Sequence, residues 1–171
     1  ESPGASGAYA FTVTPGARTT VDVDARLFMR HGVSMLGIAP LTSMFLSGKA
    51  GPWRDDFRPE VHDSDGLLIH GHNSEWLWRP LGNPQKLRVS YFDLSHPRGF
   101  GLVQRERRFR SYEDLETRFE RRPNAWITPQ GNWGNGFVKL VEIPSDKEAN
   151  DNIVAYWLPK NLPREGQSFE V

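Results

Sequence analysis

The chain has 171 residues, which is long enough for a domain with a buried core. Its 21 basic and 21 acidic residues cancel, and a chain without net charge is a poor match for nucleic acid or an anionic membrane. The absence of cysteine excludes disulfides and thiolate metal sites, and no apolar stretch approaches the length of a membrane span.

Alternating apolar and polar residues predict a succession of short β-strands separated by turns rich in Gly, Pro, Asn and Asp. The expected strands cover residues 8–14, 19–30, 67–70, 75–79, 86–93, 99–104, 124–128, 137–143, 153–158 and 168–171. Residues 34–45 are apolar but contain a proline, which predicts short strands or a buried loop, and residues 47–66 are rich in proline, glycine and charge and predict a long loop. Strands of this number and spacing favour a mainly β protein, an antiparallel β-sandwich.

One short helix is predicted at residues 111–121. Ser111 suits its N-cap, and acidic residues follow in the first turn, where negative charge is favoured. Pro123 ends it. The apolar stripe that this helix would bury consists of Tyr112, Leu115 and Phe119.

Residues 153–158 are apolar at every position, a pattern typical of a central strand covered on both faces. The polar loop before this strand carries the carboxylates Asp146, Glu148 and Asp151. A rigid strand end is a good place to hold an acid for chemistry. Glycoside hydrolysis requires a pair of carboxylates, one protonated and one ionised, and Asp63 and Asp151 come from distant segments that a sandwich can bring to one cleft.

A second acidic motif, VHDSDG at residues 61–66, holds Asp63 and Asp65 beside His62. The functional interpretation is a general base. The alternative is a turn, because Asp and Ser favour turn conformations, and the motif alone favours the turn.

Histidines offer a metal-binding alternative. His70 and His72 would point to the same face of a strand, and His62 is near them in sequence, but no third ligand is identified. Trp76 and Trp78 would also share one face of a strand, where they either stack on a sugar ring or belong to the core.

Three long stretches closely resemble the periplasmic glucan biosynthesis proteins of the OpgG/OpgD (MdoG/MdoD) type. They are GIAPLTSMF, RPEVHDSDGLLIHGHNSEWLWRPLGNP, and the run from GFGLVQRERRF to NDNIVAYWLP. The likeness covers nearly all 171 residues. Family members are longer, with a signal peptide, a large β-sandwich resembling galactose mutarotase and a C-terminal immunoglobulin-like domain. The resemblance implies that residues 1–171 are a single domain forming the C-terminal part of the large sandwich, located in the periplasm.

The same resemblance implies activity on β-1,2-glucan, as an anomer-inverting glycoside hydrolase or a related transglycosylase. By motif, Asp151 in KEANDNIV matches the family's general acid, and Asp63 in VHDSDG matches its general base. Glu148 matches a supporting carboxylate and Arg122 a loop arginine near the cleft. Asp65 stands where the family usually has Asn, and a second carboxylate there would alter the titration of the base.

We further expect Trp76, Trp78 and His70 to contact the glucan, and we expect no metal or cofactor. The alternative function is a non-catalytic protein that binds glucan on Trp76, Trp78 or Trp133 and assists a membrane glucosyltransferase. The isolated 171 residues are expected to lack activity.

Overall fold

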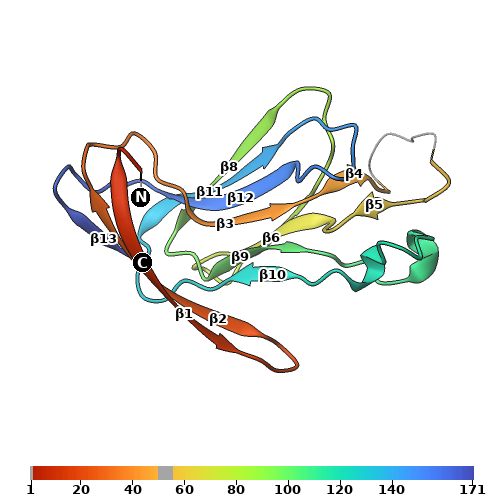
Figure 1. Cartoon of the computed structure of the whole chain (residues 1–171), viewed down its shortest axis with the longest axis horizontal. Helices are drawn as coiled ribbons and strands as arrows, with labels where there is room; N and C mark the ends of the chain where they lie inside the picture. The colour runs from red at the N-terminus through yellow and green to blue at the C-terminus, as the bar shows by residue number, and fades with distance from the viewer. Residues whose placement is uncertain (1, 50–55) are drawn as a thin grey trace. The chain divides into compact units, whose positions relative to one another are not determined.

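The computed structural model describes residues 2–49 and 56–171, so the loop predicted at 47–66 lies partly outside the described residues. The structure is mainly β, with antiparallel strand pairs, as predicted. The chain divides into two compact units, one formed by residues 1–36 and 160–171 and the other by residues 37–159 (Figure 1).

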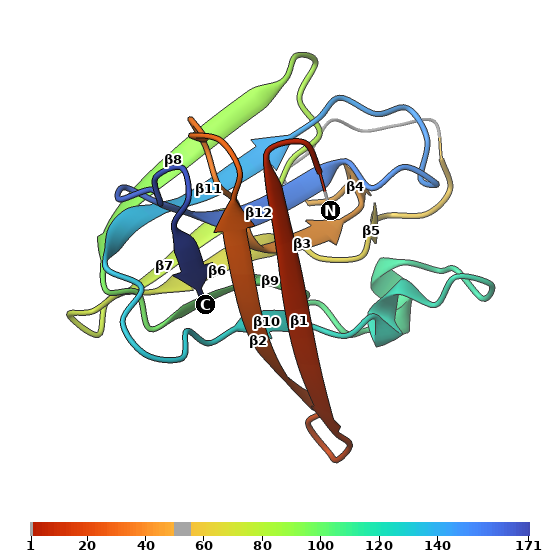
Figure 2. The same cartoon turned by 60° about the vertical axis from the view of Figure 1, so that its left-hand side comes forward.

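The first unit is a three-stranded antiparallel sheet in the order β1-β2-β13 (Figure 2). Strands β1 (Ala5–Thr14) and β2 (Thr20–Met29) form the predicted hairpin, and β13 (Ser168–Glu170) pairs with the other edge of β2. The hairpin turn contains the Pro-Gly pair that breaks the alternation in the sequence.

The second unit contains two four-stranded antiparallel sheets that lie in two layers in both Figure 1 and Figure 2. One sheet has the order β10 (Ala125–Ile127), β9 (Gly99–Val103), β6 (Gly66–His70) and β7 (Trp76–Pro80). The other has the order β3 (Ile38–Ser43), β12 (Ile153–Pro159), β11 (Asn135–Glu142) and β8 (Arg88–Ser95). A short pair, β4 (Phe45–Ser47) with β5 (Val61–His62), continues from one end of β3.

Alternate residues of the two sheets form the core, as expected for a sandwich. The buried side chains of the first sheet are Leu67, Ile69, Phe100 and Leu102, and those of the second are Val138, Leu140, Ile153, Ala155 and Trp157. Strand β12 is central, as predicted, but only one of its faces is fully buried. Its other face is half-buried.

The predicted helix at residues 111–121 is wrong. Two one-turn 3-10 helices stand there instead, η1 (Phe109–Ser111) and η2 (Phe119–Arg121). Glu113 and Arg118 adopt positive φ angles of 53° and 54°, which an α-helix does not allow.

A side chain replaces the helical hydrogen bonds in this segment. Asp114 accepts from the backbone N–H groups of Glu116 at 2.9 Å and Thr117 at 2.7 Å, and it also receives Arg58 at 2.8 Å. Aspartate competes in this way with helix formation, and here a tertiary ion pair reinforces the turn.

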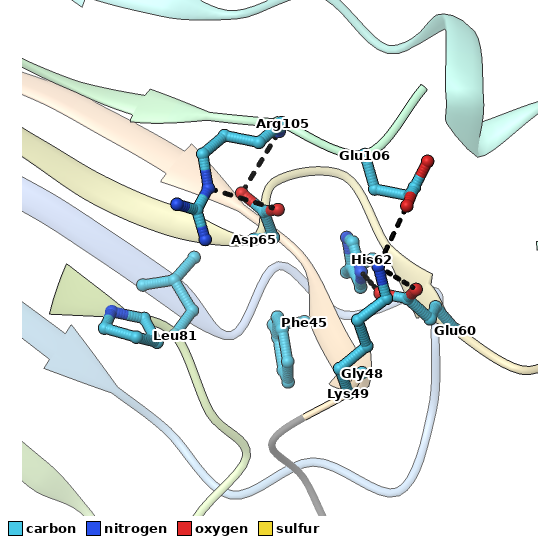
Figure 3. A pocket seen from close by; sticks show the side chains of 10 residues that line it. Phe45, Gly48, Lys49, Glu60, His62, Asp65, Leu81, Arg105 and Glu106 are labelled. Atoms are coloured by element: carbon cyan, nitrogen blue, oxygen red, sulfur yellow. Dashed lines mark hydrogen bonds and ion pairs between the residues drawn. The ribbon is translucent and has the colours of Figure 1, made fainter. Parts of the chain in front are cut away.

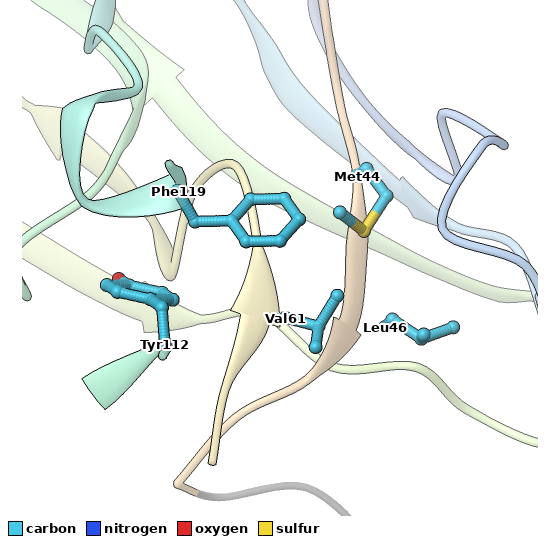
Figure 4. Close-up of a cluster of buried hydrophobic side chains, with 5 residues drawn as sticks. All are labelled: Met44, Leu46, Val61, Tyr112 and Phe119. Atoms are coloured by element: carbon cyan, nitrogen blue, oxygen red, sulfur yellow. The ribbon is translucent and has the colours of Figure 1, made fainter. Parts of the chain in front are cut away.

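The expected apolar stripe is therefore divided. Tyr112 and Phe119 are buried, whereas Leu115 is 78% exposed. Figure 4 shows the two aromatic rings packed with Met44, Leu46 and Val61 of the β4–β5 region. This cluster anchors the segment before Arg122 to the end of the sandwich.

Candidate functional site

The stretch of residues 42–45, where β3 gives way to β4, holds both predicted acids. The backbone N–H of Asp63 donates to the carbonyl of Met44 at 2.9 Å. The hydroxyl of Thr42 donates to Oδ2 of Asp151 at 3.1 Å. Two aspartates that are far apart in sequence are thus attached to the same four residues, Asp151 by its carboxylate and Asp63 by its backbone.

Asn152 fixes the backbone on which Asp151 stands. Its side chain is 2% exposed, its Oδ1 accepts from the N–H of Phe45 at 2.8 Å, and its Nδ2 donates to the carbonyls of Phe45 and Ile143, each at 3.0 Å. The amide therefore joins the start of β12 to β4, while Asp151 itself remains exposed.

Asp63 is held on the opposite side of the same stretch. Its neighbour Ser64 forms a buried hydroxyl contact of 2.5 Å with Ser43. Its Oδ1 is buried and lies 2.9 Å from Nε of Arg122, an ion pair without hydrogen-bond alignment. The structure thus places the guanidinium of Arg122 against Asp63, the residue that the sequence nominated as a base.

The electrostatic environment of Asp63 links it to Asp151. Burial raises the pKa of Asp63, the charge of Arg122 lowers it, and the charge of Asp151 raises it again, so that the net shift is upward. A carboxylate with a raised pKa is a stronger base. Asp65 lies apart from this pair, with its Oδ1 accepting from the backbone of Arg105 at 3.2 Å.

Glu148 belongs to a neighbouring ion-pair cluster. Its carboxylate lies 2.7 Å from Arg58, which also pairs with Asp56 and Asp114. These groups border an open depression of about 700 Å³ beside the loop that carries Glu148 and Asp146. Glu148 thus pairs with Arg58 and shares a loop with Asp151.

The three residues expected to bind glucan, His70, Trp76 and Trp78, lie elsewhere, on the sheet that contains β6 and β7. His70 stacks on Trp76 with a ring separation of 4.0 Å, and Trp126 of β10 lies 5.8 Å from Trp76. Trp126 lies close over Gly101, where a β-carbon would come within 2.8 Å of its ring. Trp76 is 56% and Trp126 37% exposed, so the two indoles form an open surface.

Trp78 is less accessible than its neighbour in β7. The guanidinium of Arg105 covers it at 3.7 Å from the ring centre, and its ring lies over Gly66. Trp133, the other candidate for sugar stacking, lies 6.2 Å from the core residue Trp157. Trp76 is therefore the most exposed of the three indoles that were predicted to stack on sugar.

The histidines do not come together as metal ligands. Both ring nitrogens of His62 have protein partners, Gln104 at 2.7 Å and Glu60 at 3.0 Å, while His70 stacks on Trp76. In the part of the chain that the structure describes, no group of three His, Cys, Asp or Glu side chains could hold a metal ion.

Figure 3 shows a cavity of about 390 Å³ on the side of the 61–66 segment that His62 and Asp65 face. Its charged walls pair with one another: Lys49 bridges Glu60 and Glu106 at 3.5 Å and 2.8 Å. Among its described lining residues there is neither Asp63 nor Asp151. The cavity is therefore separate from the carboxylate pair.

The sequence interpretation missed the residues that hold the acids in place. Thr42, Asn152 and Gln104 act through contacts with segments far away in the chain, and no local pattern marks such contacts. The only available signal was the position of Asn152, which directly follows the candidate acid and begins a strand.

The fold and the site define a β-sandwich protein with two carboxylates and an arginine gathered at one end of its sheets. All of residues 1–171 match the family described as "Periplasmic glucan biosynthesis protein, MdoG". The chain belongs to this family, which assigns it to glucan biosynthesis in the periplasm. No helix formed by the described residues could span a bilayer.

One relative is the "Glucans biosynthesis protein G" of Pseudomonas putida. It is 56% identical over 171 residues, an alignment that covers 99% of this chain and 31% of the relative. The chain thus spans about a third of the length of that protein.

Proposed function

We propose that the protein cleaves β-1,2-glucan by general acid–base catalysis, with Asp151 as the acid and Asp63 as the base. The observation that supports this most directly is the attachment of both aspartates to residues 42–45, Asp151 by its carboxylate and Asp63 by its backbone N–H. Each comes from the segment that the family resemblance nominated.

The two carboxylates differ in environment. Asp151 is exposed, so a sugar chain can reach it. Asp63 is partly buried, and its raised pKa makes it a better proton acceptor.

The proposed reaction transfers one proton at each end. Asp151 gives its proton to the glycosidic oxygen as the bond from that oxygen to the anomeric carbon breaks. Water attacks the anomeric carbon from the opposite side and loses a proton to Asp63, so the anomeric configuration inverts. If a sugar hydroxyl replaces the water, the same groups carry out transglycosylation.

Arg122 has a defined part in this scheme. Its guanidinium lies against Asp63 and favours the ionised carboxylate, so it keeps the base ready although burial opposes ionisation. Because the chain spans 31% of its relative, we infer that catalysis requires the full-length protein that contains this chain.

The test is the release of reducing ends from linear β-1,2-glucan by the full-length protein. We expect release to continue in the presence of a chelator such as EDTA, because the mechanism uses carboxylates alone. Binding of glucan without release of reducing ends would contradict the enzymatic proposal.

A second candidate function is a glucan-binding protein that assists a membrane glucosyltransferase, and the open indole surface favours it. Trp76 and Trp126, with His70 stacked beneath the first, offer flat apolar faces of the kind that sugar rings stack on. This surface lies at the end of β6 that is farther from Asp63.

We expect Trp126→Ala to weaken glucan binding by roughly tenfold, equivalent to about 1.4 kcal/mol, measured by titration calorimetry. Phe57→Ala is the control, because Phe57 is an exposed aromatic residue outside the sheet. An unchanged affinity in the Trp126 variant would remove the indole surface from the glucan site.

A further inference from the structure

Gln104, directly after β9, is buried between the two backbone segments of the candidate site. Its side chain is 2% exposed. Nε2 donates to the carbonyl of His62 at 3.2 Å and to that of Phe119 at 3.0 Å. Its own N–H donates to Oδ1 of Asn124 at 2.8 Å. A single residue thus contacts the strand before Asp63 and both sides of Arg122.

The orientation of this amide is fixed by chemistry. Nε2 faces two carbonyl oxygens, and a flipped amide would place its oxygen against both of them. Oε1 therefore faces Nδ1 of His62 at 2.7 Å, and that ring nitrogen must donate the hydrogen bond.

The other ring nitrogen of His62 faces a carboxylate. Nε2 lies 3.0 Å from Glu60. Burial alone would raise the pKa of Glu60, but the hydrogen bond and charge of His62, with the charge of Lys49, lower it overall, so the carboxylate is ionised. Stacking of His62 on Phe45, with the ring centres 5.2 Å apart, also holds the imidazole in place.

These contacts connect the two halves of an ion pair. His62 directly precedes Asp63, and Phe119 begins the turn η2 that ends one residue before Arg122. Gln104 holds the carbonyl of each segment, and the two charged side chains meet at 2.9 Å. The amide therefore links the backbone of the Asp63 segment to that of the Arg122 segment.

We propose that Gln104 is a positioning residue for the base: with His62 as its partner, it sets the separation between Asp63 and Arg122. This inference rests on the proposed function for its catalytic consequence. The charged groups that face Asp63 are Arg122 from the loop after η2, Asp151 from the loop before β12, and His62 from β5. The backbone around Arg122 is held from two sides, by Gln104 at Phe119 and by Arg107, whose guanidinium donates to the carbonyl of Arg122.

The first test is Gln104→Met, which keeps the length of the side chain and removes its hydrogen bonds. In a crystal structure of the full-length variant, we expect Arg122 Nε to lie more than about 4 Å from Asp63 Oδ1, beyond ion-pair range. We also expect kcat on β-1,2-glucan to fall roughly 10–100-fold with KM within about twofold, as for residues that orient a reacting group. Loss of the ion pair with Arg122 would raise the pKa of Asp63. The acidic limb of the pH profile of kcat would therefore shift to higher pH.

Two further variants separate positioning from folding. Gln104→Glu keeps an acceptor toward His62 but loses both donors, and we expect it to reproduce the kinetic loss. Asn124→Ala changes an exposed residue and loosens Gln104 from the other side, so a smaller effect in the same direction is expected even if the Gln104 variants fail to fold. Gln130→Met, at an exposed position, is the control.

The crystallographic and kinetic results judge different claims. An Asp63–Arg122 separation that stays near 2.9 Å in Gln104→Met, or in Asn124→Ala if the former does not fold, overturns the positioning role. A wild-type protein without glucanase activity refutes the proposed function, and the separation of the ion pair in the variants still decides the role of Gln104.

Discussion

Replacing Asp151 by asparagine is expected to abolish cleavage of linear β-1,2-glucan by the full-length protein while leaving glucan binding largely intact. Asparagine has the size of aspartate and still accepts a hydrogen bond from Thr42, so the loop should keep its conformation. It has no acidic proton to give to the leaving oxygen. The loss of general acid catalysis corresponds to a fall in kcat of roughly 10²–10⁴-fold, measured as reducing ends released per enzyme.

Asp146→Asn is the matched control for this prediction. Asp146 lies exposed in the same loop, and the variant removes the same charge without touching residues 42–45. We expect its activity to stay close to that of the wild type. Full activity in Asp151→Asn would eliminate Asp151 as the acid, and equal losses in both variants would indicate a general effect of loop charge.

Asn152→Ala is expected to cause the largest loss of stability among single changes at the site. The variant removes three hydrogen bonds, two to the N–H and carbonyl of the buried Phe45 and one to the carbonyl of Ile143, which is partly buried. With unsatisfied buried groups costing about 1–3 kcal/mol each and partial relaxation, we expect a loss of roughly 2–4 kcal/mol in the free energy of unfolding, measured by urea denaturation.

Two variants define the cause of that loss. Asn150→Ala, two residues earlier and exposed, is expected to change stability by less than about 0.5 kcal/mol. Asn152→Asp keeps the size of the side chain but directs a carboxylate at two carbonyl oxygens, so we expect it to be destabilised at neutral pH and partly restored when acid protonates it. A loss below about 1 kcal/mol in Asn152→Ala would mean that the amide does not hold β12 to β4.

The strands could be predicted because their signal is local. Alternation over five or more residues places β1, β2, β8 and β11, and a run of apolar residues identifies β12 as central. The helix prediction failed because its decisive contact is not local. Asp114 prefers a turn when Arg58, 56 positions earlier, binds its carboxylate.

The site was only half predictable for the same reason. Family motifs identified Asp63 and Asp151, but nothing in the sequence indicates that both attach to residues 42–45. Nothing in the sequence distinguishes Gln104 from other polar residues that follow a strand, although its side chain connects the segments of Asp63 and Arg122. Hydrogen bonds between residues that are 15 and 42 positions apart produce no periodic pattern in the sequence.

The shared attachment of both acids has a consequence for local unfolding. Thr42 holds Asp151, Met44 holds Asp63, and Phe45 holds Asn152, so separating this short stretch from the sandwich would release both carboxylates in one step. Fluctuations of that size follow cooperative units of structure. The molecule is therefore expected to alternate between a state with the whole pair assembled and a state with neither acid in place, with little population in which one is set and the other is free.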